Sequence, residues 1–218
     1  MSEEAFAEYV AGKTIAIIGP APFRHGDRQA AIEHDLIYRV SEASWEGRID
    51  IQYLSKQNLR DWSLDQRRVH GDWLCLKVPD RKQKLNTDAQ TRVCRLNLNG
   101  KMNPNQVTGA IMDLEHFEPA DVNVYGADLY VSGRETMYRE GYYMERFHNF
   151  DKSKHWAGIQ AHRPWLQHET ARAIMLRTGW FSRSTAYREA LELDNAEYMA
   201  RLKDNWGVKE PARPGWAA

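Results

Sequence analysis

The sequence predicts an α/β fold, a single Rossmann-like domain whose mostly parallel central sheet is flanked by helices, as in variant GT-A-type enzymes. Two compact apolar runs each end on a glycine, at Gly19 and Gly126, which is typical of buried parallel strands. Helix-like and strand-like segments alternate along the chain, and no repeat or low-complexity linker divides its 218 residues. We therefore expect one domain over residues 1–218, with flexible ends at 1–12 and 207–218.

Composition narrows the class of protein. The chain has 42% hydrophobic and 28% charged residues, which is typical of a globular domain. Its 30 basic and 30 acidic residues cancel, so no overall field attracts nucleic acid or anionic membranes. The acidic N-terminus is unlike a signal peptide, and no apolar run approaches the roughly 18 residues of a membrane span. We expect a soluble, cytoplasmic protein with no membrane span.

The first half of the chain predicts three strands. Residues 13–19 form a buried strand, and the loop at 20–27, rich in proline and glycine, leads to a helix at 28–34 with Asp27 as its N-cap. Residues 35–40 and 49–54 predict the second and third strands. Residues 73–78 are also strand-like, whereas the polar, basic segment 80–92 predicts a solvated loop or helix face.

The second half predicts a helix at 107–117 and then a strand at 120–126. A long helix at 165–177 ends at Gly179, and one further helix covers 187–203. The two cysteines, Cys75 and Cys94, are too few for a disulfide framework and match no common zinc spacing, so we expect two reduced thiols.

Four of the eight histidines lie between residues 148 and 168. The pKa of a histidine is close to neutral, so this residue type suits a general base at pH 7. His148, His155 and His162 are seven residues apart and would align on a helix, but a glycine and a proline interrupt that helix, so no metal site is predicted. For His155 and His168 we expect a surface or packing role.

The glycine that ends each apolar run suggests a nucleotide. Ligands of open parallel sheets lie at the carboxyl ends of the strands, where glycine lets the backbone approach a phosphate and a helix N-terminus supplies N–H donors. Here Gly19 and Gly126 end the strands, and the helix before the second strand opens at Thr108 and Gly109. The chain contains neither the G-x-G-x-x-G pattern nor a P-loop.

Four segments resemble, in order, the motifs of the sialyltransferases, glycosyltransferase family 29. Residues 15–22 with 32–41 are similar to the large motif of the family, and residues 104–109 with 122–126 to its small motif. Residues 148–151 are similar to the third motif and 162–169 to the last. The resemblance spans residues 13–179.

The resemblance implies an inverting glycosyltransferase that needs neither a metal nor a cofactor besides its nucleotide-sugar co-substrate. His162 would be the general base that deprotonates the acceptor hydroxyl, and His148 would lie beside the departing phosphate. The residues that would contact the donor nucleotide are Gly19, Pro20, Ala21, Ser41, Thr108, Gly109 and Gly126.

Departures from the family leave the substrates open. Pro20, Ala21 and Ser41 stand where the family has Asn, Ser and Asn, so the donor can be CMP-sialic acid or another nucleotide sugar. We expect neither the motif-linking disulfide nor the membrane anchor of the family, as in a bacterial or phage relative. The acceptor can be a glycan, a small molecule or a modified base in DNA, and the oligomeric state is open. A DNA acceptor would use a basic face made of Arg81, Lys82, Lys84, Arg92 and Arg95.

Two further alternatives remain at this point. One is a non-catalytic nucleotide-binding protein, because side-chain amides that read the donor are missing. The other is a different nucleotide-dependent α/β enzyme, such as a hydrolase or a phosphotransferase. The role of Glu169 also stays open, since it lies further from His162 than the family pattern expects.

Overall fold

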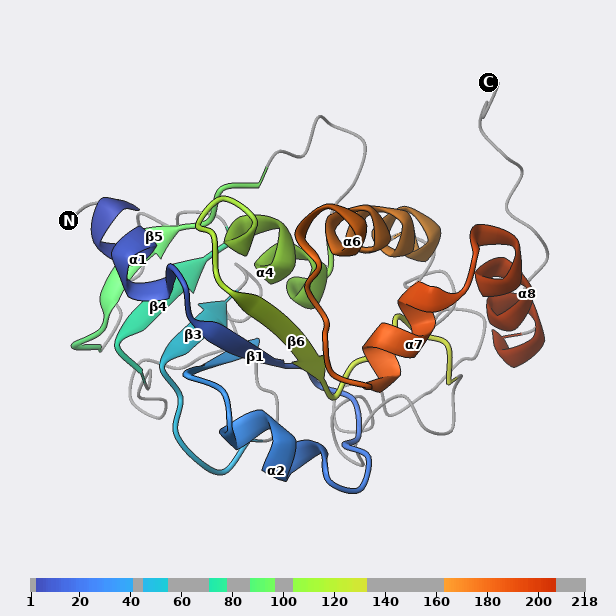
Figure 1. The fold of residues 1–218 in the computed structure, drawn as a ribbon, viewed down its shortest axis with the longest axis horizontal. Helices are drawn as coiled ribbons and strands as arrows, with labels where there is room; N and C mark the ends of the chain where they lie inside the picture. The colour runs from blue at the N-terminus through green and yellow to red at the C-terminus, as the bar shows by residue number, and fades with distance from the viewer. Residues whose placement is uncertain are drawn as a thin grey trace, which may run out of the picture.

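The computed structural model describes residues 3–40, 45–54, 71–77, 87–96, 104–132 and 163–206. At its centre is a six-stranded sheet with the order β5-β4-β3-β2-β1-β6, in which every pair of neighbours is parallel (Figure 1). The α/β class and the parallel sheet are thus confirmed. The strands are β1 (Thr14–Ile18), β2 (Leu36–Val40), β3 (Ile51–Leu54), β4 (Trp73–Leu76), β5 (Gln90–Val93) and β6 (Asp121–Tyr125).

The strand order reverses at β1. Strands β2 to β5 follow one another away from β1, whereas β6 lies on the other side of β1. Helix α2 (Asp27–Ile32), between β1 and β2, covers one face of the sheet, and α4 (Gln106–Leu114), between β5 and β6, covers the other (Figure 1). Right-handed crossovers require this change of face. The carboxyl ends of β1 and β6 therefore form a topological switch point, where open α/β sheets bind ligands.

Alternate residues of the strands enter different cores. Ile15 and Ile17 of β1 belong to the large core on the α4 side, whereas Ala16 and Ile18 belong to the smaller core on the α2 side. Burial on both faces explains why the strand is apolar without interruption. The large core also takes in α1 (Glu3–Val10), whose Phe6 is fully buried. The sequence predicted a flexible lead-in here; instead, α1 packs against the sheet because Phe6 meets Trp73 edge-on.

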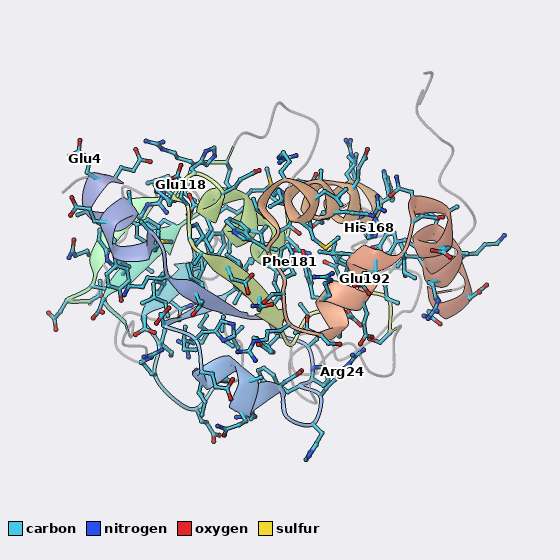
Figure 2. The ribbon with its side chains drawn as sticks, in the orientation of Figure 1. Glu4, Arg24, Glu118, His168, Phe181 and Glu192 are labelled. Carbon is cyan, nitrogen blue, oxygen red and sulfur yellow. The ribbon has the colours of Figure 1, made fainter. Side chains whose placement is uncertain are left out.

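Among the described residues that follow β6, the helices are α6 (Pro164–Thr178), α7 (Ala186–Glu192) and α8 (Asn195–Trp206). The prediction of one helix over 187–203 is wrong. Leu193 has extended backbone angles, and the Asp194 carboxylate accepts hydrogen bonds from the amides of Ala196 and Glu197, so a new helix begins there. Between α6 and α7, the Phe181 amide donates to the Val122 carbonyl at 2.9 Å and so covers the outer edge of β6 (Figure 2).

Three further predictions about helices and strands differ from the structure. Asp27 is the first residue of α2 rather than its N-cap; Gly26 is the N-cap, and the Asp27 carboxylate accepts from the Arg24 amide. Helix α4 starts at Gln106, two residues before Thr108. Residues 90–92, the end of the segment 80–92 predicted as a solvated loop or helix face, belong instead to the edge strand β5 (Gln90–Val93). Among the described helices, none has both the length and the apolar character that crossing a bilayer requires.

Candidate functional site

The loops that follow β1 and β6 join backbone to backbone. The Gly19 amide donates to the Tyr125 carbonyl at 2.8 Å, and the Ala21 amide donates to the Gly126 carbonyl at 2.6 Å. A Cβ atom on Gly19 would lie 2.4 Å from the Gly126 oxygen, and Gly126 itself has a φ of +64°. The close approach of the two loops thus requires glycine at both positions, whether or not a ligand binds.

This pairing uses the amide groups that a phosphate would need. The amides of Gly19 and Ala21 already bond to carbonyls of the β6 side, and Pro20 has no amide hydrogen. The structure therefore places these three predicted residues together with Gly126 at the switch point. No amide of Gly19, Pro20 or Ala21 is thus left to bind an anion, so backbone donors for one have to come from other residues.

The N-terminus of α4 lies on the opposite side of the same edge from α2. Asn105 is its N-cap, with extended backbone angles, and its Oδ1 accepts from the Thr108 amide at 2.9 Å. The Thr108 side chain is fully buried, and a Cβ atom on Gly109 would lie 2.6 Å from the Tyr53 hydroxyl. Thr108 and Gly109 hence pack α4 onto the sheet. The amide of Val107, in the first turn, has no acceptor among the described residues.

Helix α6 runs parallel to α4, so both N-termini meet at this edge. Near their starts, the Asn105 amide donates to Gln167 Oε1 at 3.0 Å. Near their ends, Arg177 and Glu115 form an ion pair at 2.5 Å. Two helix N-termini at one place provide amide donors and the positive ends of two helix dipoles.

One of the two predicted catalytic residues, His162, adjoins this place in the sequence. His162 directly precedes Arg163, the N-cap of α6, which has a φ of 49°. His148 and His162 lie outside the described residues, as does Ser41, which follows β2. Non-glycine residues with positive φ are uncommon and often occur at functional sites.

The loop after β6 brings an aromatic side chain to the start of α4. Tyr130 is partly buried, and its hydroxyl accepts from Asn105 Nδ2 at 3.3 Å. Sequence reasoning missed Asn105, Gln167 and Tyr130. An asparagine before a helical pattern is a typical N-cap and could have been recognised, whereas no local pattern indicates the contacts of Gln167 and Tyr130.

The α2 side of the switch point is acidic. Arg24 forms a bidentate ion pair with Glu189 of α7, at 2.5 and 2.8 Å (Figure 2). Asp27 and Asp128 face the same guanidinium, and burial raises the pKa of both carboxyls. Since carboxylates already surround this arginine, an anion would meet repulsion here and find a better place beside α4.

His168 has a packing role, one of the two roles predicted for it, and does not lie at the surface. It is fully buried on α6, its Nε2 lies 2.9 Å from the Ala190 carbonyl, and its ring stacks on Tyr198 at 4.1 Å (Figure 2). Burial lowers the pKa of His168, so the ring is neutral at pH 7. Burial also raises the pKa of the partly buried Glu169.

A buried polar cluster lies inside the large core, away from the switch point. Cys75, Cys94 and Asp113 place their ligand atoms within 4.8 Å of one another, and all three are buried. Arg92 already neutralises Asp113, at 2.5 and 2.9 Å, and its Nη1 lies 3.6 Å from Cys75 Sγ. A guanidinium therefore supplies the positive charge that a metal ion would bring, which makes this cluster a structural one.

The burial of Arg92 corrects the basic face considered for a DNA acceptor. Arg92 is 8% exposed and bonded to Asp113, and Arg95 is paired with Glu3, so Arg92 cannot contact a phosphate backbone. The remaining members of that face, Arg81, Lys82 and Lys84, lie outside the described residues.

No protein-family model matches the chain, and no curated protein is significantly similar to it.

Proposed function

We propose that this protein is an inverting glycosyltransferase that uses a nucleotide-activated sugar and binds the donor nucleotide at the switch point between β1 and β6. One observation carries the proposal: the segments that resemble the large and small motifs of the sialyltransferases, far apart in the sequence, end side by side at Gly19 and Gly126. The resemblance requires both motifs to contact one donor, and adjacent carboxyl ends at a switch point satisfy that requirement.

The phosphate of the donor is best accommodated on the α4 side. The amides of Gly19 and Ala21 are engaged, and the α2 side is acidic. Helix α4 offers the amide of Val107 and the positive end of its dipole, and the start of α6 is beside it. In the transition state these groups would stabilise the charge that grows on the departing phosphate.

His162 is the proposed general base. It directly precedes the N-cap of α6, the helix whose start adjoins that of α4. It would take the proton of the acceptor hydroxyl while that hydroxyl attacks the anomeric carbon, and the sugar–phosphate bond would break on the opposite face. His148 would assist the leaving phosphate, as the resemblance implies.

The test is nucleotide binding followed by transfer. The purified protein is screened by thermal shift against CMP, UDP, GDP and their common sugar conjugates, since a ligand at a hundredfold excess over its dissociation constant stabilises the fold by about 2.7 kcal/mol. We expect one nucleotide class to raise the melting temperature. His162→Ala should keep that shift and lose sugar transfer. His116, an exposed histidine at the far end of α4, provides the control. His116→Ala should change neither the shift in melting temperature nor the sugar transfer.

The competing function is nucleotide binding without chemistry. The observation that favours it is the absence of a free amide at Gly19, Pro20 and Ala21. It would be supported by nucleotide binding without turnover on broad acceptor mixtures. Failure of every nucleotide to shift the melting temperature would contradict both readings.

A further inference from the structure

The loop after β6 holds two consecutive non-glycine residues in a left-handed conformation. Leu129 has a φ of 53° and Tyr130 a φ of 70°. L-residues rarely adopt this conformation because the Cβ atom crowds the backbone, and bulky residues do so least. Glycine or asparagine would fit with less strain, so the contacts around the loop have to maintain this conformation.

Four side chains from three elements hold the loop in place. Within the loop, the carboxylate of Asp128 accepts from the amides of Tyr130 at 3.0 Å and of Ser132 at 2.9 Å. From α8, the buried Tyr198 hydroxyl donates to the Leu129 carbonyl at 2.7 Å, and Asn205 Nδ2 donates to the Val131 carbonyl. From the start of α4, Asn105 Nδ2 donates to the Tyr130 hydroxyl at 3.3 Å.

The strained backbone presents the ring of Tyr130 at the place where α4 and α6 begin. Its hydroxyl bonds to the N-cap of α4, and the same Asn105 is tied to α6 through Gln167. The ring packs against the large core and is partly buried there, so that part of it stays exposed, in contrast to the fully buried Tyr198 that supports the loop. A fixed, partly exposed aromatic ring is a platform on which a flat ligand group can stack.

We propose that Tyr130 is a ligand-contacting residue whose ring stacks on the nucleobase of the bound donor. The inference rests on the proposed function, because it assumes that a nucleotide binds at this edge. Asp128, Tyr198 and Asn205 are positioning residues, which act on the ligand only through the loop. The base lies over Tyr130, with the phosphate toward the start of α4.

The test separates binding from folding. Tyr130→Asn and Tyr130→Gly remove the ring but suit a positive φ, so we expect the melting temperature of the unliganded protein to change by a few degrees at most. Their dissociation constant for the nucleotide that binds the wild type, measured by titration calorimetry, should rise by about tenfold or more. Tyr130→Phe keeps the ring and should bind within about twofold of the wild type.

Tyr9 provides a matched control. It is also partly buried, and its hydroxyl donates to Asp72 at 2.7 Å, near the amino ends of the strands. Tyr9→Ala should leave the dissociation constant unchanged. If the wild type binds a nucleotide and Tyr130→Asn and Tyr130→Gly bind it equally well, the stacking role is overturned while the proposed function stands. If the wild type binds no nucleotide, the proposed function itself fails.

Discussion

Removal of one partner of the Arg92–Asp113 ion pair should strongly destabilise the fold. Both side chains are buried, with 6% of Arg92 and none of Asp113 exposed. The Asp113 carboxylate accepts two bonds from Arg92 and a third from the Arg95 amide at 2.7 Å. The guanidinium also lies over the ring of Phe6 at 4.3 Å and that of Phe117 at 4.7 Å. Asp113→Ala would leave this guanidinium in the core with the partly exposed Glu3 carboxylate, 3.9 Å from its Nη2, in place of a buried partner that accepts two hydrogen bonds.

The expected magnitude follows from that burial. Breaking a buried pair from one side costs about 3–5 kcal/mol, whereas an exposed pair contributes about 0–1 kcal/mol. The Arg24–Glu189 pair is the matched exposed case, with half of each side chain in solvent. Glu189→Gln should therefore cost little. Arg92→Met combined with Asp113→Leu removes both charges and should recover most of the stability that Asp113→Ala loses.

Urea unfolding at pH 7 measures these differences. With a slope of about 1–3 kcal/mol per molar urea, the loss in Asp113→Ala should lower the midpoint by about 1 M or more. Added salt should hardly alter that loss, because buried charges are weakly screened. If Asp113→Ala unfolds at nearly the same urea concentration as Glu189→Gln, the pair is solvated and the reasoning is refuted.

Three further predictions concern the core. Burial lowers the pKa of both His34 and His168, so as the pH falls these histidines become protonated in the unfolded chain before they do so in the folded protein. The free energy of unfolding should therefore fall by up to about 1.4 kcal/mol per pH unit for each histidine below about pH 6.5. Urea midpoints that stay constant from pH 7.5 to 5.5 would contradict this. Gly109→Ala sets a methyl group against the Tyr53 hydroxyl and should cost about 1–3 kcal/mol in urea unfolding, part of which Tyr53→Phe in the same chain should restore. Cys75 and Cys94 are buried and should react with Ellman's reagent only in denaturant, so fast labelling of the native protein would show that they are accessible.

The sequence was sufficient for the strands that have both faces buried. β1 and β6 carry continuous apolar runs, because side chains on either face enter a core. β5 was missed because it is an edge strand: of its four residues only Arg92 is buried, so its polar pattern resembles a loop. The break between α7 and α8 was missed because the Asp194 cap lies inside a continuous helical pattern.

For the candidate site, too, the sequence predicted some residues and missed others. The sequence placed Gly19 and Gly126 at strand ends. Both positions require glycine because the two loops approach closely, and this tertiary contact cannot be seen in the local sequence pattern. No sequence pattern indicated Tyr130 as a site residue. Bulky residues seldom adopt a positive φ, and at Tyr130 only the surrounding contacts maintain this conformation. The local sequence pattern therefore located the edge of the sheet, but it did not identify the side chains that meet there.

One last prediction decides on which side of the edge the phosphate lies. If it bound beside α2, Glu189→Gln would release Arg24 and tighten nucleotide binding, and Arg24→Ala would weaken it. We expect neither change, because the engaged amides and the acidic surroundings favour the start of α4.

Asn105→Asp is the complementary variant. Aspartate is as good an N-cap as asparagine, so α4 should remain intact, but its charge would oppose a phosphate at the first turn. We expect the nucleotide dissociation constant to rise by about tenfold, and the rise should shrink in high salt. Unchanged binding in Asn105→Asp together with tighter binding in Glu189→Gln would move the phosphate to the α2 side, where Arg24 would then be its partner.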